Sequence, residues 1–405
     1  MSFGVLYISY DGILEPLGQS QVLSYLRKLA LNRNIHLISF EKVEDWKNRN
    51  IRDSMLKEIA AAGIFWHPLR YHKRPNSLAT LWDILCGTIL GLCLVIRYQI
   101  QIIHARSYVA SVMALALKRL TSAKFLFDMR GFWADERVDG DLLTKNSLLY
   151  KTAKWCEKQF LLNADVVVSL TEAAVKVMRQ YPYLKTRMPT FEVITTCTDL
   201  DLFKPNETEQ LVCEAYFNLG YVGSVSVSYL FDEVLQCFNL LRQEIPNARL
   251  HILNRGEHGY IRNRLKYHNI DIEIVRLEAT DHIGVVSAMC QMNAGIFFIK
   301  QVHSKIASAP TKLGEFLGCG VPCLSNEGVG DMASILEGKQ VGVAVNNFDE
   351  SSMKNAILRL LHLTREPDIK QRCQKVAHDC FSLDIGVDKY SNIYDSLMGR
   401  AEISK

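Results

Sequence analysis

The chain has 405 residues, of which 48% are hydrophobic and 22% are charged. That length and composition predict two or three folded domains and exclude a disordered or fibrous protein. The net charge of +4 gives no strong basic field, so we expect no nucleic acid partner. Residues 1–200 hold 26 Lys and Arg against 18 Asp and Glu, and residues 201–405 hold 21 against 25. The basic first half fits contact with anionic lipid or a phosphorylated substrate, and equally an unevenly charged soluble surface.

The 11 cysteines are an odd number without a C-x-x-C pair, which favours free thiols in a reducing compartment. The closest pair, Cys319 and Cys323, has no neighbouring His or Cys that would complete a zinc site. Residues 3–9 have the pattern of a strand and lack the basic region of a secretory leader. We therefore expect a cytoplasmic protein.

Short apolar strands alternate with longer amphipathic stretches from the first residues, which is typical of parallel sheets linked by crossover helices. In the first half we expect strands at residues 4–9, 36–40, 63–68, 101–104, 123–128, 166–170 and 192–195. The helices expected between them cover residues 19–31, 46–62, 78–97, 108–120, 147–162 and 172–181.

The alternation restarts after a polar stretch, residues 199–209, which we interpret as a linker. The second half predicts strands at residues 220–223, 248–254, 272–277, 294–299, 322–326 and 342–345. Its expected helices cover residues 230–243, 260–268, 282–290, 311–317, 331–336 and 350–362. The fold class is therefore α/β, with two doubly wound domains over residues 1–196 and 197–382. Ligands of such sheets bind at the carboxyl ends of the strands, so the site residues should lie in the loops there.

The helix expected at residues 78–97 contains the longest uncharged apolar run, residues 84–96. At about 1.5 Å per residue this run covers roughly 20 Å, which is too short for a hydrocarbon core near 30 Å. Two interpretations remain: a buried core helix, or a helix that lies on a membrane. In the second case its interfacial anchors would be Trp82, Arg70, Lys73 and Arg74.

Two loops of the first half are candidates for ligand contact. Gly18 and Gln19 precede a helix start expected at Ser20, whose N–H groups would suit an anion, although an ordinary helix start has the same residues. The spacing does not match G-x-G-x-x-G, so a nicotinamide dinucleotide is not supported. Residues 128–137 form a charged loop that would contact phosphate or sugar hydroxyls, or else pair its own charges. Its candidates, with one residue from the preceding strand end, are Arg130, Trp133, Asp135, Glu136 and Arg106.

Asp139 and Asp141 have the spacing of a metal-binding aspartate pair. They follow the charged loop, and acids two residues apart are common by chance, so we do not expect magnesium there.

The second half offers a stronger candidate at residues 305–322. Pro310 predicts a helix N-terminus, with Thr311 and Lys312 in the first turn. A lysine is disfavoured beside the positive end of a helix unless an anion binds between them, which predicts a nucleotide diphosphate. Glu315 lies on the same helix face, where it would accept hydrogen bonds from ribose, or else form a surface pair with Lys312. Gly223 ends the second domain's first strand and permits close approach of a ligand, or is a plain strand end.

On these motifs the sequence resembles the retaining glycosyltransferases of family 4. The resemblance rests on residues 10–21, on Arg130-Gly-Phe-Trp-Ala-Asp-Glu136, on residues 163–172 and 197–203, on Tyr221-Val-Gly-Ser224, and on Pro310-Thr-Lys-Leu-Gly-Glu315 with Gly320-Val-Pro322. It covers nearly the whole chain. It implies two facing Rossmann-like domains of the GT-B type, with a C-terminal helix, residues 383–405, that crosses back to the first domain.

The resemblance further implies that the second domain binds a nucleotide-sugar donor and the first receives the acceptor. Glu315 matches the ribose-binding second acid of the family's Glu-x7-Glu motif, whereas Ala307 replaces the first acid, with Ser308 beside it. The Arg and Lys that the family places after the strand ending at Gly223 are also absent, because that stretch begins at Ser224. Lys312, Lys305 and Arg130, with the N–H groups at Thr311, are the candidates to replace them. No metal or other cofactor is then expected.

The function implied is retaining transfer of a sugar to a glycan or lipid-linked acceptor, in bacterial surface polysaccharide assembly. The protein would contact the cytoplasmic face of the inner membrane peripherally. Two alternatives stay open: a transferase-like scaffold that has lost donor chemistry, and a nucleotide-sugar epimerase.

Overall fold

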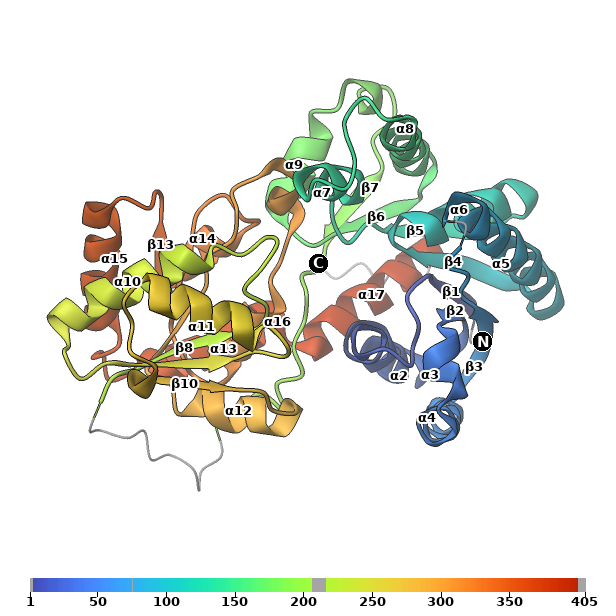
Figure 1. The fold of residues 1–405 in the computed structure, drawn as a ribbon. Helices are drawn as coiled ribbons and strands as arrows, with labels where there is room; N and C mark the ends of the chain where they lie inside the picture. The colour runs from blue at the N-terminus through green and yellow to red at the C-terminus, as the bar shows by residue number, and fades with distance from the viewer. Residues whose placement is uncertain (1–2, 75, 206–215, 400–405) are drawn as a thin grey trace. The chain divides into compact units, whose positions relative to one another are not determined.

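The computed structural model describes residues 3–74, 76–205 and 216–399 (Figure 1). The chain divides into two compact units. Unit 1 comprises Met1–Ile194 with Leu383–Lys405, and unit 2 comprises Thr195–Ser382. The end of the expected linker, from residue 206, lies outside the described residues.

Unit 1 is built on a seven-stranded parallel sheet with the strand order β3-β2-β1-β4-β5-β6-β7. All seven strands expected from the sequence are present, because buried parallel strands are continuous apolar runs. Their bounds are β1 Gly4–Ser9, β2 Asn34–Glu41, β3 Ile64–Arg70, β4 Ile100–Arg106, β5 Lys124–Asp128, β6 Val166–Ser169 and β7 Thr190–Val193.

The helices of unit 1 follow the strands in alternation. Asn48, Ser147 and Thr171 cap three of them, each accepting a hydrogen bond from a first-turn N–H. The bounds are α1 Pro16–Gly18, α2 Ser24–Ala30, α3 Val43–Lys47, α4 Arg49–Ala61, α5 Asn76–Tyr98, α6 Ser107–Leu120, α7 Trp133–Asp139, α8 Leu148–Asn163, α9 Glu172–Arg179 and α17 Leu383–Leu397. Short turns lie at η1 Gln19–Leu23 and η2 Pro182–Leu184.

The last helix, α17, belongs to unit 1 although residues 195–382 separate it from the rest in sequence. Its Tyr390 packs edge-on against Tyr25 of α2, with ring centroids 5.8 Å apart. Tyr394 hydrogen-bonds the ring of His104 on β4 at 2.7 Å. The helix therefore covers one face of the sheet, as the resemblance implied.

Unit 2 has a six-stranded parallel sheet with the order β10-β9-β8-β11-β12-β13. The strands are β8 Asn218–Val222, β9 Arg249–Leu253, β10 Val275–Glu278, β11 Ala294–Ile296, β12 Cys323–Asn326 and β13 Gly342–Val345. The helices are α10 Phe231–Glu244, α11 His258–Tyr267, α12 His282–Cys290, α13 Thr311–Gly318, α14 Met332–Gly338, α15 Glu350–Leu363 and α16 Ile369–Phe381. Short turns lie at η3 Ile272–Ile274 and η4 His303–Ala307.

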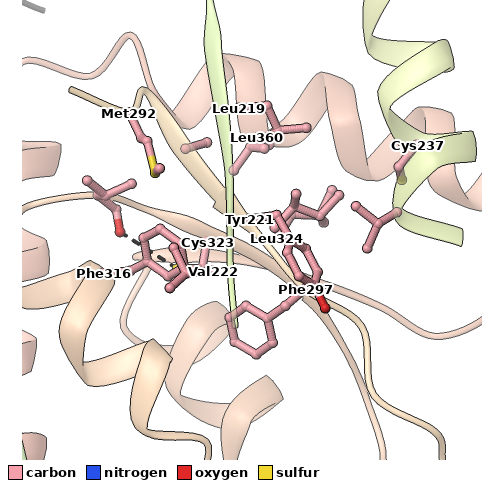
Figure 2. Close-up of a cluster of buried hydrophobic side chains, with 14 of the residues drawn as sticks. Leu219, Tyr221, Val222, Cys237, Met292, Phe297, Phe316, Cys323, Leu324 and Leu360 are labelled. Atoms are coloured by element: carbon pink, nitrogen blue, oxygen red, sulfur yellow. Dashed lines mark hydrogen bonds between the residues drawn. The ribbon is translucent and has the colours of Figure 1, made fainter. Parts of the chain in front are cut away.

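The core of unit 2 is packed tightly around this sheet (Figure 2). Phe316 of α13 is fully buried, and its ring lies 2.9 Å from where a Cβ on Gly295 would stand. Met292 likewise packs on Gly220, and its sulfur lies 1.9 Å from where a Cβ on Gly220 would stand. Both glycines lie in strands, so a larger residue would push Met292 or Phe316 off the sheet.

Three local expectations differ from the structure. The first helix of unit 1 begins at Pro16 rather than near Ser20, because proline suits a first helical position. The charged stretch expected as a loop contains α7, whose Asp135 and Glu136 favour the positive end of a helix. The strand expected at residues 272–277 begins at Val275, after the short turn η3 that Asp271 caps.

Candidate functional site

Each sheet has a point where the strand order reverses, and ligands of open parallel sheets bind outside the carboxyl ends of the strands at such points. In unit 2 the reversal lies between β8 and β11, and in unit 1 it lies between β1 and β4. Most of the residues predicted for the donor, from Gly223 to Glu315, follow β8 and β11, whereas Gly18 and Gln19 follow β1. Those predicted for the acceptor side follow β4 and β5.

The side chain of Lys312 lies against the end of β8. Its Nζ is 3.1 Å from where a Cβ on Gly223 would stand, and the φ of Gly223 is +106°. Any side chain at this glycine would be strained and would press on the lysine. The structure therefore brings Lys312 to the place where the missing Arg and Lys were expected, at the start of the loop after Gly223.

Aromatic rings surround the Lys312 amine. Nζ lies 4.0 Å from the ring centre of Tyr229, 5.1 Å from that of Tyr221 and 5.3 Å from that of Phe297. Figure 2 shows the last two of these rings within the core. Lys312 is only 8% exposed, and among the described residues its Nζ has no hydrogen-bond partner. Cation–π contacts replace only part of the lost hydration, and among the described residues no acceptor makes a hydrogen bond to the amine.

Burial shifts the pKa of both charged residues of α13 toward neutrality. It lowers the pKa of Lys312 from 10.5 to about 7, against the attraction of Glu315. It raises the pKa of Glu315 from 4.5 to about 7, against the attraction of Lys312. The alternative interpretation of the sequence, in which Lys312 and Glu315 form a surface ion pair, is therefore wrong. Perturbed groups at a sheet's switch point are typical of a ligand site.

The loop after Gly223 is held by a carboxylate that sequence reasoning missed. Glu257, at the start of α11, accepts hydrogen bonds from the Val225 N–H at 3.1 Å and from the Asn254 side chain at 2.8 Å. Although burial opposes it, hydrogen bonds from Ser226, Asn254, Val225 and Ser224 lower the pKa of Glu257 to about 2. Ser224 is thus part of a fixed loop. No sequence signal found Glu257, because 32 residues separate it from Val225.

The remaining donor candidates lie at the start of α13. Pro310 is the N-cap of this helix rather than its first residue, and no side chain caps it. In the first turn the Leu313 N–H donates to the Pro310 carbonyl at 3.1 Å, so the N–H groups of Thr311 and Lys312 are the ones left at the positive end of the helix. Lys305 is buried in η4, and its carbonyl accepts from Ser308 N at 3.1 Å and Gly330 N at 2.9 Å. Ala307, where the family has an acid, is 2% exposed.

In unit 1, polar groups are buried at the carboxyl end of β4 and β5. Arg106 and Asp128 are register partners, and both are at most 5% exposed. Asp11 lies 3.4 Å from the Arg106 guanidinium, and Tyr390 donates a hydrogen bond to Asp128 at 3.1 Å. The Nε and Nη1 of Arg106 have no hydrogen-bond partner among the described residues. Burial lowers the pKa of the adjacent His104, which is therefore neutral.

Arg130 follows β5 in a strained conformation, with a φ of +59°, before Gly131 at +142°. Its guanidinium donates to Gln21 at 3.3 Å. Despite burial, the nearby Asp128 raises the pKa of Arg130, so it stays charged. A non-glycine residue in this region costs about 1–3 kcal/mol and is typical of functional sites.

The other acceptor-side candidates lie on α7. Asp135 is buried and accepts hydrogen bonds from Tyr150 at 2.8 Å and Lys154 at 3.1 Å. It therefore ties α7 to α8 and positions its neighbours instead of facing a ligand. Trp133 packs on Tyr108, with ring centroids 5.6 Å apart, and Glu136 is exposed.

Gly18 and Gln19 differ from expectation because α1 begins at Pro16. Gly18 lies inside the helical turn, where a Cβ would stand 2.0 Å from the Gly12 carbonyl, so its role is close packing. Gln19 N donates to Glu15 O at 3.0 Å and is unavailable to an anion. The buried Glu41 accepts from Ile13 N and Leu14 N at 2.8 and 3.1 Å.

Residues 3–74, 76–205 and 216–399 contain no group of three or more His, Cys, Asp or Glu side chains that could hold a metal ion. A groove of about 570 Å³ lies in unit 1 at the other end of the sheet, beside the first residues of β4 and β5. Because ligands of open parallel sheets bind at the carboxyl ends of the strands, this groove is not a candidate for the catalytic site.

A family model described as a glycosyl transferase 4-like domain matches residues 50–188. No curated protein matches the sequence. Among solved structures, sucrose-phosphate synthase (tll1590) from Thermosynechococcus elongatus is similar, with a TM-score of 0.71, 15% identity and coverage of 98% of this chain and 99% of that one. Alr3699/HepE of Anabaena, solved with UDP and glucose, has a TM-score of 0.68, 12% identity and coverage of 97% and 99%. The lipopolysaccharide outer core galactosyltransferase WaaB has a TM-score of 0.64, 12% identity and the same coverage.

Proposed function

We propose that this chain, a family 4-like glycosyltransferase with the GT-B fold, moves a sugar from a nucleoside diphosphate sugar to a glycan or lipid-linked acceptor. Both the resemblance and the α/β fold class predicted from the sequence are confirmed. The observation that carries the proposal is the buried, unpartnered Lys312 amine at the switch point of unit 2. A diphosphate at the start of α13 would supply the anion that this amine lacks.

The proposed reaction needs negative charge to be stabilised on the departing diphosphate. The bond between the anomeric carbon and the phosphate oxygen breaks, and the acceptor oxygen bonds to that carbon. Its proton passes to the departing phosphate, with retention at the anomeric carbon. Lys312 and the N–H groups at Thr311 would hold the diphosphate, while Glu315 would accept hydrogen bonds from the ribose. These groups supply the positive charge, so we propose a reaction without metal.

The nucleotide is proposed to be UDP, because Alr3699/HepE was solved with UDP and with UDP-glucose. The acceptor is proposed to bind unit 1, near Arg106, Arg130, Trp133 and Glu136. We place the reaction at the cytoplasmic face of the bacterial inner membrane, in surface polysaccharide assembly. The basic first half of the chain supports this location.

Calorimetric titration with UDP, GDP, ADP and CDP tests the proposal, with magnesium and with chelator. We expect micromolar binding of one nucleotide that chelator leaves unchanged and Lys312→Met weakens. The exposed Lys339→Met on unit 2 is the matched control and should bind like the unmodified protein. Absence of binding by all four nucleotides would refute the donor assignment.

One observation favours a second function. Ala307 is buried where the family has its first acid, so the hydroxyls of the donor sugar lack a carboxylate there. A scaffold subunit that has lost donor chemistry would show this change. It would bind no nucleotide, whereas the transferase would bind UDP. With a UDP-sugar and no acceptor, the transferase would slowly hydrolyse the bond between the sugar and the diphosphate, with water taking the place of the acceptor, and release UDP and the free sugar.

A further inference from the structure

Helix α5 presents an apolar face to solvent along most of its length. Six large side chains on it are between 50 and 67% exposed. At about 100° per residue they share an arc of about 100°, and they extend over about 27 Å. We call this the α5 stripe; its residues are Leu78, Leu81, Trp82, Leu85, Ile89 and Ile96. Monomeric soluble proteins rarely expose so continuous an apolar surface.

The opposite face of α5 is packed into unit 1. A Cβ on Gly87 would stand 2.5 Å from the sulfur of Met113, and one on Gly91 would stand 2.8 Å from Leu117, so both glycines let α6 approach closely. Asp83 is 1% exposed and accepts from the Tyr10 hydroxyl at 2.9 Å, while the ring of His72 lies 2.6 Å from its carboxylate.

By length and composition alone, α5 could cross a membrane. If α5 crossed a membrane, Asp83 would lose its contacts with Tyr10 and His72 and its carboxylate would lie in hydrocarbon. The helix is therefore part of the folded unit.

The charges that flank α5 in the sequence are nearly all of one sign, although one of them, Arg106, is buried beside Asp11. Residues 59–127 contain eight Lys and Arg and a single acid, the buried Asp83. Lys73 and Arg74 are exposed just before α5, and Arg97 is exposed at its end. Past Ile96, which lines the groove of about 570 Å³, that groove is also lined by Leu120 and Lys124. Apolar surface framed by cations is complementary to an anionic lipid surface.

We propose that α5 lies in the plane of an anionic membrane, with the α5 stripe inserted among the lipids and Lys73, Arg74 and Arg97 at the headgroups. The hydrogen bond from Tyr10 to Asp83 ties the start of the helix to the carboxyl edge of the sheet. The membrane surface therefore lies beside the acceptor edge of unit 1. The consequence for the substrate rests on the proposed function: the acceptor is lipid-linked and is reached from the bilayer.

Vesicle flotation tests the proposal. The full chain should float with vesicles of phosphatidylcholine and phosphatidylglycerol and much less with phosphatidylcholine alone. Leu85→Ser/Ile89→Ser should lower the bound fraction by about tenfold or more, because it removes two inserted side chains. Lys73→Gln/Arg74→Gln should abolish the preference for anionic lipid. Ile283→Ser/Leu358→Ser, which changes two exposed side chains of unit 2, is the matched control and should float unchanged.

Trp82 gives a local readout. Lipids brominated on the acyl chains should quench the fluorescence of Trp82. In Trp82→Phe, the part of the quenching that comes from this residue should be lost. An alkaline carbonate wash should release the protein from vesicles. Equal flotation of Leu85→Ser/Ile89→Ser would overturn the proposal, as would retention after the wash. A dimer in solution that the same variant dissociates would also overturn it, because a second copy would then cover the α5 stripe.

The test separates this inference from the proposed function. Leu85→Ser/Ile89→Ser should bind UDP like the unmodified protein, since the nucleotide is assigned to unit 2. Flotation without UDP binding would refute the donor assignment and leave the membrane surface standing. UDP binding without flotation would refute the membrane surface alone.

Discussion

Replacing Lys312 by methionine should have opposite effects on two quantities: it should lower the affinity for UDP and raise the free energy of unfolding. Methionine keeps most of the volume and the contacts with Tyr221 and Tyr229, and removes the charge. A net charge-assisted hydrogen bond contributes about 1.5–3 kcal/mol. The affinity for UDP should therefore fall by roughly 10- to 150-fold at pH 7.

The same change should stabilise unit 2. The pKa of Lys312 falls from 10.5 in the unfolded chain to about 7 in the folded one. At pH 7 this difference costs the folded state roughly 4 kcal/mol, because the unfolded chain keeps a proton that the buried amine holds weakly. The cost is full below pH 7 and disappears as the pH rises to 10.5. Removing the amine should therefore raise the free energy of unfolding at pH 7, and the gain should vanish near pH 10.5.

Urea unfolding at pH 7 and pH 10 and calorimetric titration with UDP measure the two effects on one protein. Lys339→Met, an exposed lysine on the same unit, should change neither quantity. A Lys312→Met protein that is less stable at pH 7 would refute the reasoning, since the amine would then be a structural partner. Unchanged UDP affinity would remove Lys312 from the donor site.

Three further predictions concern the same site. The affinity for UDP should be highest near pH 7. Above pH 7 it should decline by up to about tenfold per pH unit as Lys312 loses its charge, and below pH 7 by about tenfold in all as Glu315 is protonated. A flat profile in titrations from pH 5 to 9 would contradict this. If Glu315 binds the ribose, Glu315→Gln should lower the affinity for UDP by about tenfold and leave the affinity for 2′-deoxy-UDP unchanged. Gly223→Ala should lower the affinity for UDP because its Cβ presses on Lys312. Gly256→Ala, at a φ of +95° with open space around it, should lower only the stability, by about 1 kcal/mol or more. Equal UDP affinity of the two variants would argue against the contact between residue 223 and Lys312.

The sheets could be predicted from the sequence because most of the parallel strands are buried apolar runs between turn residues; the edge strands β3 and β7 are only partly buried. The helix α7 could not, since its seven residues, Trp133 to Asp139, carry no apolar periodicity and four charges. Lys312 could be singled out because a cation at the start of a helix conflicts with the helix dipole. Its aromatic surroundings could not, because Tyr221, Tyr229 and Phe297 come from separate segments that only the fold brings together. Glu257 was missed for the same reason.

The direction in which the pKa of a buried lysine shifts distinguishes two sites in this chain. In α8, Lys154 lies 2.6 Å from Glu157 and 3.1 Å from Asp135, and their attraction outweighs burial and raises the pKa of the lysine. That group is already satisfied and holds α7 to α8. On α13 burial outweighs the attraction between Lys312 and Glu315, so both pKa values move toward neutrality. For Lys154, by contrast, attraction prevails over burial, although burial also raises the pKa of its partner Glu157. Since Lys312 and Glu315 cost stability where they are, a ligand that supplies the missing partners is the physical reason for their place at the switch point.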